Sequence, residues 1–170
     1  MSEPLITTTD LAAYLQRDLD QYSADLAVRG ASGLVRTYCG WGISRAVETL
    51  TVDANGGISV NLPTLKLNDV TAVRVDGELL DPDDYMWGGN GVLVARHRWP
   101  GRLRAVEADV DHGYDPTPDE VRIVVSVMAG RVYANPEGLI QRSSGDSSKS
   151  FTSGVLTDLE MRLISAYRLT

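Results

Sequence analysis

The sequence predicts an α+β fold in which a four-helix core carries an antiparallel β-sheet domain inserted between its second and third helices. Three observations support this prediction. Apolar residues follow helical spacing over residues 1–40, alternate at every second position over 41–115, and return to helical spacing over 116–170. We therefore expect residues 1–40 and 116–170 to form one folding unit, and residues 41–115 to form the inserted domain.

The helix predicted over residues 117–135 is the element around which the others are arranged. Thr117, Pro118 and Glu120 stand where a helix start takes an N-cap residue, a proline and a capping glutamate. Wound at about 3.6 residues per turn, this helix is apolar on two opposite faces. One face carries Val121, Val124, Val125, Met128 and Val132, and the other carries Ile123, Val127, Gly130 and Ala134. The narrow polar strips between them hold Arg122, Ser126 and Tyr133 on one side, and Glu120 and Arg131 on the other. A helix apolar on two faces needs a second covering surface, either from its own fold or from another copy of the chain.

Two amphipathic helices are predicted before the inserted domain. Thr8 or Thr9 is expected to cap the first, in which Leu11, Leu15 and Leu19 follow helical spacing. The second begins at Ser23 and ends at Gly40.

The inserted domain is predicted to be a run of short antiparallel strands. The first hairpin joins residues 47–53 to 58–62 through a turn at Asn55-Gly56, a pair that favours tight β-turns. The other predicted strands are 70–75, 78–80, 85–87, 92–95 and 104–111, of which the first four form two further hairpins.

The C-terminal part combines a serine-rich segment with a last helix. Residues 141–154 offer only Phe151 as an apolar anchor, so we expect this segment to stay mobile until a partner packs on it. Thr157 and Glu160 then form a capping box that starts a helix running to about Arg168. A hydrophobic staple of Leu156 and Met161 accompanies it, and its apolar stripe consists of Leu159, Leu163, Ala166 and Tyr167.

Charge and composition exclude several classes of function. The chain has 170 residues, 23 acidic and 16 basic, which gives a net charge of −7 and argues against avid binding to nucleic acid or to an anionic membrane. No apolar run approaches the roughly 20 residues that span a bilayer. Cys39 is the only cysteine, so no internal disulfide is possible, and the N-terminal residues lack the pattern of a signal peptide. We expect folding in a reducing cytoplasm.

Few residues could support catalysis. His112 follows Asp111, which could be a fragment of a catalytic triad, but no nucleophile motif accompanies the pair, and His97 lies in a basic turn. Cys39 lies among apolar neighbours and is expected to be a buried small residue. We expect no enzymatic activity and no cofactor.

Two acidic clusters and one basic cluster are candidate binding sites. Either acidic cluster could hold calcium, but neither has EF-hand spacing, so a solvated acidic surface is favoured and no metal is expected. These clusters are Asp81, Asp83 and Asp84, and Glu107, Asp109 and Asp111. The basic cluster is expected to pair with carboxylates of a neighbouring strand or subunit rather than with nucleic acid. It consists of Arg96, Arg98, Arg102 and Arg104 around Trp99.

Several different short motifs follow one another in a characteristic order along most of the chain. They are residues 10–15 (DLAAYL), 38–41 (YCGW), 112–115 (HGYD) with Pro118, 128–136 (MAGRVYANP), 144–151, and Leu156-Thr157 with Glu160 and Tyr167-Arg168. In this order and spacing the chain resembles the head-to-tail connector, or adaptor, proteins of long-tailed bacteriophages, particularly those that infect actinobacteria.

The resemblance implies a virion protein of the neck, assembled in the host bacterial cytoplasm. Its copies, twelve in related connectors, would form a homo-oligomeric ring that docks under the portal protein, extends the DNA channel, and receives a downstream neck or tail protein. The residues expected at the subunit or portal interface are Ile123, Val127, Gly130, Ala134, Phe151, Leu156, Leu159, Leu163 and Tyr167. An acidic chain suits a channel through which DNA slides without binding.

Two alternatives remain open at this stage. The first is another neck or tail protein, such as a head stopper or tail terminator. The second is a small cytoplasmic binding module whose β domain holds a ligand or calcium, using the acidic clusters with Trp87 or Trp99.

Overall fold

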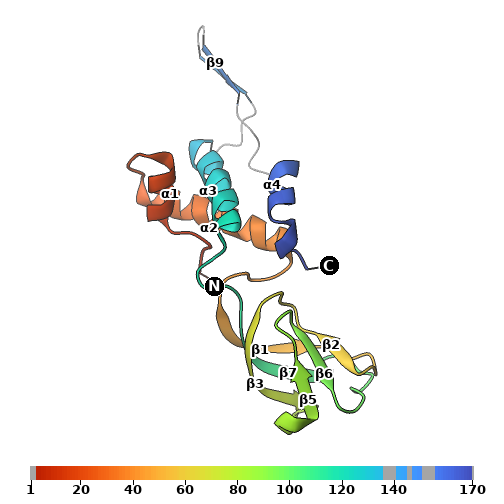
Figure 1. Ribbon diagram of the computed structural model, residues 1–170. Coiled ribbons are helices and arrows are strands. Elements are labelled where there is room, and N and C mark those ends of the chain that lie inside the picture. The colour runs from red at the N-terminus through yellow and green to blue at the C-terminus, as the bar shows by residue number, and fades with distance from the viewer. Residues whose placement is uncertain (1–2, 136–140, 145–146, 151–155, 170) are drawn as a thin grey trace. The chain divides into compact units, whose positions relative to one another are not determined.

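The computed structural model describes residues 3–135, 141–144, 147–150 and 156–169, and it has the α+β class that the sequence predicts (Figure 1). The chain divides into two compact units. One unit holds the chain up to Cys39 together with Thr117–Arg168, and contains the helices; the other holds Gly40–Pro116 and contains two β-sheets. No helix in the described part of the chain has the length and apolar character needed to cross a membrane.

The helical unit is built on the pair α2 (Gln21–Cys39) and α3 (Asp119–Ala134). Small side chains on α2 let the two helices approach closely, and the predicted inner face of α3 is buried against them. The buried residues are Ala24, Ala27, Val28, Ala31 and Val35 on α2, and Val121, Val124, Val125 and Met128 on α3. The unit is completed by α1 (Thr8–Leu15) and by α4 (Asp158–Leu163), which a short 3-10 turn at Ser165–Tyr167 follows.

The predicted boundary between the first two helices is wrong. Thr7 caps α1, which ends at Leu15 because Gln16 turns into the left-handed region (φ 52°). The carboxylate of Asp20, rather than Ser23, then starts α2 by accepting a hydrogen bond from the Ser23 N–H at 2.9 Å.

The ends of the other two helices also differ from the prediction. Pro118 itself is the N-cap of α3, in an extended conformation and without a side-chain cap, so the predicted Thr117–Glu120 capping box does not form. The Thr157–Glu160 capping box of α4 is confirmed. This helix nevertheless ends at Leu163 instead of continuing to Arg168, because Ile164 leaves helical geometry.

The β unit contains a four-stranded and a three-stranded antiparallel sheet. The first has the order β1-β7-β3-β4, and the second has the order β2-β6-β5. The strands are β1 (Ala46–Val52), β2 (Ser59–Asn61), β3 (Leu67–Val75), β4 (Glu78–Leu79), β5 (Tyr85–Trp87), β6 (Val92–Ala95) and β7 (Val106–His112), with a 3-10 turn at Pro82–Asp84 before β5. Buried residues of both sheets form one shared core that includes Val73, Leu93, Trp99 and Val106.

Two of the three predicted hairpins are confirmed, namely β3–β4 and β5–β6. The first is wrong, because β1 pairs with β7 and β2 pairs with β6 in the other sheet. The chain leaves β1 at Ala54, which is buried and donates its N–H to the carbonyl of Arg102 at 3.0 Å. Asn55 then accepts a hydrogen bond from the Gly57 N–H at 2.9 Å, so the turn redirects the chain across to the second sheet.

The serine-rich segment contains two short strands. β8 (Gln141–Ser144) and β9 (Ser147–Ser150) pair antiparallel (Figure 1). Phe151, which was expected to anchor this segment, lies outside the described residues, and the expected mobility of the segment stays a prediction.

Candidate functional site

The outer face of α3 carries an apolar strip that the helical unit leaves open. Ile123 is 58 % exposed, Val127 is half-buried and Ala134 is exposed. These residues are four and seven positions apart, so they lie along one line of the helix surface. We refer to Ile123, Val127 and Ala134 as the α3 strip.

The two polar strips of α3, which we call its seams, bind the elements that lie on either side of the helix. On one seam Arg122 binds Asp10 of α1 at 3.1 Å, and the Tyr133 hydroxyl accepts a hydrogen bond from the Asp20 N–H at 3.0 Å. On the other seam Arg131 binds Glu160 of α4, and α4 lies on the opposite side of α3 from α1 in Figure 1. The α3 strip therefore lies between α1 and α4.

Gly130 does not belong to the open strip, although it was expected at the interface. It is buried, and a Cβ atom placed there would lie 3.3 Å from Cδ2 of Leu15 and 3.8 Å from Cε1 of Tyr14. The glycine therefore lets α1 approach α3 closely, and its role is inside the unit.

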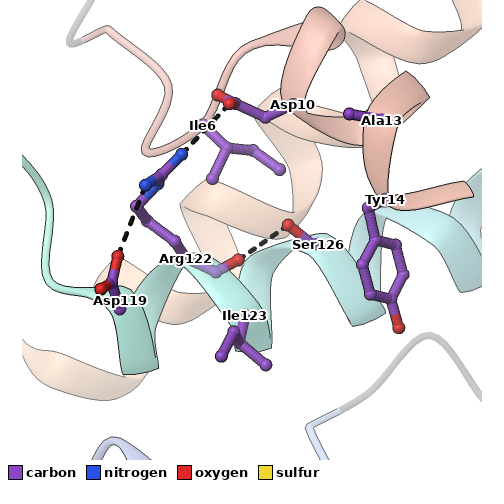
Figure 2. Close-up of a pocket in the computed structure, with 8 residues that line it drawn as sticks. All are labelled: Ile6, Asp10, Ala13, Tyr14, Asp119, Arg122, Ile123 and Ser126. Carbon is purple, nitrogen blue, oxygen red and sulfur yellow. Dashed lines mark hydrogen bonds and ion pairs between the residues drawn. The ribbon is translucent and has the colours of Figure 1, made fainter.

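The strip continues into a groove of about 390 Å³ beside α1. Figure 2 shows Tyr14 and Ile123 projecting in the same direction at this groove, while Arg122 turns toward the carboxylates of Asp10 and Asp119. Hydrogen bonds from the Thr7 backbone, together with Arg122, keep the pKa of Asp10 below its usual value. Arg122 pairs with both carboxylates, which leaves the groove with one net negative charge beside the apolar side chains of Ile6, Ala13, Tyr14 and Ile123.

The α4 helix borders the strip on the other side. Its inner side is Glu160 and Ile164, both buried, whereas Leu159 is 68 % exposed and Leu163 is 48 % exposed. A rotation of about 100° per residue places these two leucines on the flank opposite Met161, whose carbonyl accepts a hydrogen bond from the Tyr38 hydroxyl of α2 at 3.0 Å. The leucines therefore lie on the flank of α4 that faces away from α2.

The attachment of α4 to α3 is an ion pair that sequence reasoning missed. Nη2 of Arg131 lies 2.9 and 2.8 Å from the two carboxylate oxygens of Glu160, and both side chains are mostly buried. Burial raises the pKa of Glu160, but hydrogen bonds from Thr157 and Arg131 outweigh it and leave this pKa lowered. No local pattern announces the pair, since the two residues are far apart in the chain and Glu160 was expected to act only as a cap.

Two other residues expected near the interface flank this surface. Leu156 precedes the N-cap of α4 and is half-buried. Tyr167 is also half-buried, and its hydroxyl donates to the Glu120 carboxylate at 3.1 Å.

The acidic face of β7 is occupied by side chains of its own sheet. Hydrogen bonds from Thr49 and Arg74 lower the pKa of Asp109, and a bidentate contact with Arg45 lowers the pKa of Asp111. Among the described residues no group of three or more histidine, cysteine or acidic side chains is arranged to hold a metal ion.

The Asp111-His112 pair is not a triad fragment. Neighbours along a strand point to opposite faces, and His112 is buried with Nε2 3.0 Å from the Glu48 carboxylate. Cys39 is buried, as predicted, and burial raises the pKa of its thiol to about 11, so the thiol stays protonated near neutral pH. Of the four clustered arginines, Arg102 pairs with a carboxylate within the described residues, that of Asp76.

Comparison with known proteins finds similarity at the level of fold. No family model and no curated protein matches the sequence. Among solved structures, a chain from the neck of an empty gene transfer agent (GTA) particle, computed with C6 symmetry, matches with a TM-score of 0.68 and 16% identity. A chain from the neck of a native GTA particle, computed with C12 symmetry, matches with a TM-score of 0.64 and 18% identity. A chain from the virion of a native GTA particle matches with a TM-score of 0.70 and 15% identity. Each match covers 100% of this chain and 93%, 96% and 93% of the other chain, respectively. The chain therefore shares, over its whole length, the fold of protein chains found in these neck and virion structures.

Proposed function

We propose that this chain is a structural, non-enzymatic subunit of the neck of a phage-like particle. In this role it is a head-to-tail connector, whose copies form a ring beneath the portal protein, extend the DNA channel and receive a downstream neck or tail protein. The observation that carries the proposal is the full-length likeness to chains from GTA neck structures. A copy number of twelve agrees with the resemblance to phage connectors and with the C12 symmetry of one of these neck structures.

The open apolar surface of the helical unit supports assembly. The α3 strip, Tyr14 of α1, and Leu159 and Leu163 of α4 all expose apolar side chains on the helical unit. A soluble chain gains by covering such a surface with a partner. A head-to-tail contact between identical copies closes into a ring when the rotation between them permits. We assign the subunit or portal contact to this surface, with Leu156 and Tyr167 at its edge.

The charge of the chain supports a passive channel. Its net charge of −7 gives DNA phosphates little to gain from binding, so DNA could slide past the ring without being held. In this proposal the protein is assembled in the host bacterial cytoplasm and its final location is the virion neck.

The test uses the purified chain, alone and mixed with purified portal, with mass measured by light scattering after size exclusion and shape seen by negative-stain electron microscopy. We expect a ring seated on the portal. Ile123→Asp and Leu163→Asp should each abolish the ring, whereas Val47→Asp, at a more exposed apolar position on β1, should leave it intact. A wild-type chain that ignores the portal and shows a calcium-dependent melting shift would instead indicate a binding module.

A further inference from the structure

Charge in the β unit is sharply segregated along the chain. Residues 76–84 contain five acidic side chains and no basic one, and residues 85–106 contain four arginines and no acidic one. We refer to residues 76–84 as the acidic turn and to residues 96–104 as the arginine loop. Asp76 and Arg102 bind each other within the chain. Among the described residues, the other charged side chains of the two segments have no ion-pair partner.

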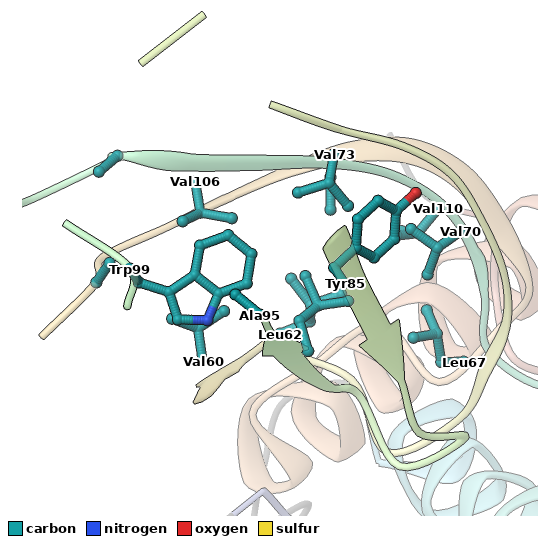
Figure 3. Packing of buried hydrophobic residues seen from close by; sticks show 14 residues of the cluster. Val60, Leu62, Leu67, Val70, Val73, Tyr85, Ala95, Trp99, Val106 and Val110 are labelled. Carbon is teal, nitrogen blue, oxygen red and sulfur yellow. The ribbon is translucent and has the colours of Figure 1, made fainter. Parts of the chain in front are cut away.

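The arginine loop is held in place by its centre. Figure 3 shows the indole ring of Trp99 inserted into the core beside Val60 and Val106. The indole N–H donates to the Ile58 carbonyl at 3.0 Å, and the Trp99 backbone N–H donates to the Gly57 carbonyl at 2.8 Å. A loop fixed in this way loses little conformational entropy when a partner binds it.

The tip of the loop presents a leucine between two arginines. Leu103 is 80 % exposed, and its neighbours Arg102 and Arg104 are exposed as well. Arg104 adopts a left-handed conformation (φ 53°), which the Asp53 carboxylate stabilises by accepting the Arg104 N–H at 2.7 Å. A non-glycine residue persists in this conformation where its surroundings impose it, so the exposed position of Leu103 is built into the loop.

The acidic turn offers a complementary surface. Glu78, Asp81 and Asp83 are exposed, and Met86, which follows them, is 72 % exposed. A hollow of about 210 Å³ is lined by Asp83, Asp84, Tyr85, Met86, Val94 and Arg96. The lining combines apolar side chains with two carboxylates and one arginine, so it is net negative and suits a leucine that lies beside an arginine.

We propose that Leu103 and Arg104 of the arginine loop in one copy dock into the hollow at the acidic turn of a second copy. The inference rests on the proposed assembly and adds a second contact to it, in the β unit. A second copy fits better than DNA, because the Arg96 N–H is bonded to the Asp84 carbonyl at 2.7 Å. A phosphate backbone that approached the loop would therefore meet the acidic turn, whereas a second copy satisfies both charges.

Charge reversal with rescue tests the contact. The loop variant carries Arg98→Glu and Arg104→Glu, and the acidic variant carries Glu78→Arg and Asp83→Arg. All four side chains are exposed, so both variants should melt like the wild type. Self-association is measured by sedimentation velocity of the chain alone and by ring formation on the portal. Each variant alone should associate at least about tenfold more weakly, because every contact then joins like charges. An equimolar mixture should recover association, because alternating copies place Glu against Arg at one contact and restore the native pairing at the next.

The outcomes separate this inference from the proposed function. If the wild type forms the ring and both variants form it equally well, or if mixing brings no recovery, the charged contact is refuted and the ring remains. If the wild type forms no contact between copies in either assay, both proposals fail. If the wild type binds fluorescent duplex DNA at physiological salt and the loop variant does not, the arginine loop is a nucleic-acid surface and this inference is wrong.

Discussion

Two positions on α3, only two residues apart, should lose very different amounts of stability on the same substitution. Val125 is completely buried against the rest of the helical unit, whereas Ile123 is on the open strip. An aspartate at position 125 would place an unpaired carboxylate in the core. An aspartate at position 123 would keep its charge in water.

The structure gives the size of the difference. Val125→Asp loses about 1.5 to 3 kcal/mol of apolar burial. Burying the unpaired charge costs several kcal/mol more. The sum of roughly 5 kcal/mol or more is comparable with the whole stability of a domain, about 5–15 kcal/mol. Ile123 is less than half buried, so Ile123→Asp should lose only about 1 kcal/mol. Val127→Asp should fall between the two, since Val127 is half-buried.

Urea unfolding of the isolated chain, followed by circular dichroism at a helix-sensitive wavelength, measures this difference. We expect Val125→Asp to be unfolded or nearly so without urea, and Ile123→Asp to have a midpoint close to that of the wild type. Equal destabilisation by the two substitutions would mean that the strip is covered within the isolated chain. The argument for an assembly surface on α3 would then be refuted.

Four further results are expected in the helical and β units. Glu160→Ala leaves Arg131 buried without its carboxylate, which should cost about 3 to 5 kcal/mol and raise hydrogen exchange throughout α4. Burial raises the pKa of the Glu160 carboxyl, but hydrogen bonds outweigh burial and leave this pKa lowered in the folded protein. The carboxylate therefore stabilises the fold above its unfolded-state pKa, and this stabilisation is lost as pH falls through the lowered folded-state value. Hydrogen exchange in α4 should rise in that acid range. Gly113→Ala should unfold the β unit, since φ is 91° and a Cβ atom there would collide with the Ser44 carbonyl. Trp99→Phe loses the indole hydrogen bond and should lower the free energy of unfolding of the β unit by about 1 to 3 kcal/mol. A lower melting temperature would show this loss.

Two of these substitutions have a matched control variant. Glu160→Gln keeps the shape of the side chain and removes its charge, so it should fall between wild type and Glu160→Ala. Gly77→Ala is the partner for Gly113→Ala, because Gly77 also has a positive φ but has no atom within contact range of a Cβ. An unchanged melt for Gly113→Ala would show that the close approach to Ser44 relaxes freely. Acid exchange of α4 that follows the rest of the helical unit would remove the special role of Glu160.

Local patterns predicted much of the fold because they depend on local physics. The change of period between residues 40 and 41 and between 115 and 116 separates helices from strands. The turns at Asp76-Gly77 and before Val92 join strands that are neighbours in sequence, so those hairpins could be predicted. The pairing of β1 with β7, which places Ala46 opposite His112, could not be predicted, because the sequence of neither strand indicates which strand it pairs with. The Asn55-Gly56 turn signal was therefore assigned to the wrong pairing.

The candidate site was predictable in part for the same reason. Helical periodicity alone identified the second apolar face of α3, and Ile123 is open in the structure. The same periodicity could not reveal that α1 covers Gly130, because that depends on how Leu15 packs. It also gave no sign that Arg131 and Glu160 meet, since their approach depends on the fold and not on their spacing.

Glu160 performs two tasks with one oxygen atom. Oε2 accepts hydrogen bonds from the backbone and hydroxyl of Thr157 at 2.8 and 2.9 Å, and Nη2 of Arg131 lies 2.8 Å from the same atom. A helix of six residues is too short to persist alone in water. The oxygen that caps α4 is thus also the oxygen that attaches α4 to α3, so formation of the helix and its docking should occur together. A neighbouring molecule that bound Arg131 in place of Glu160 would therefore cause α4 to unfold, rather than to detach as an intact helix.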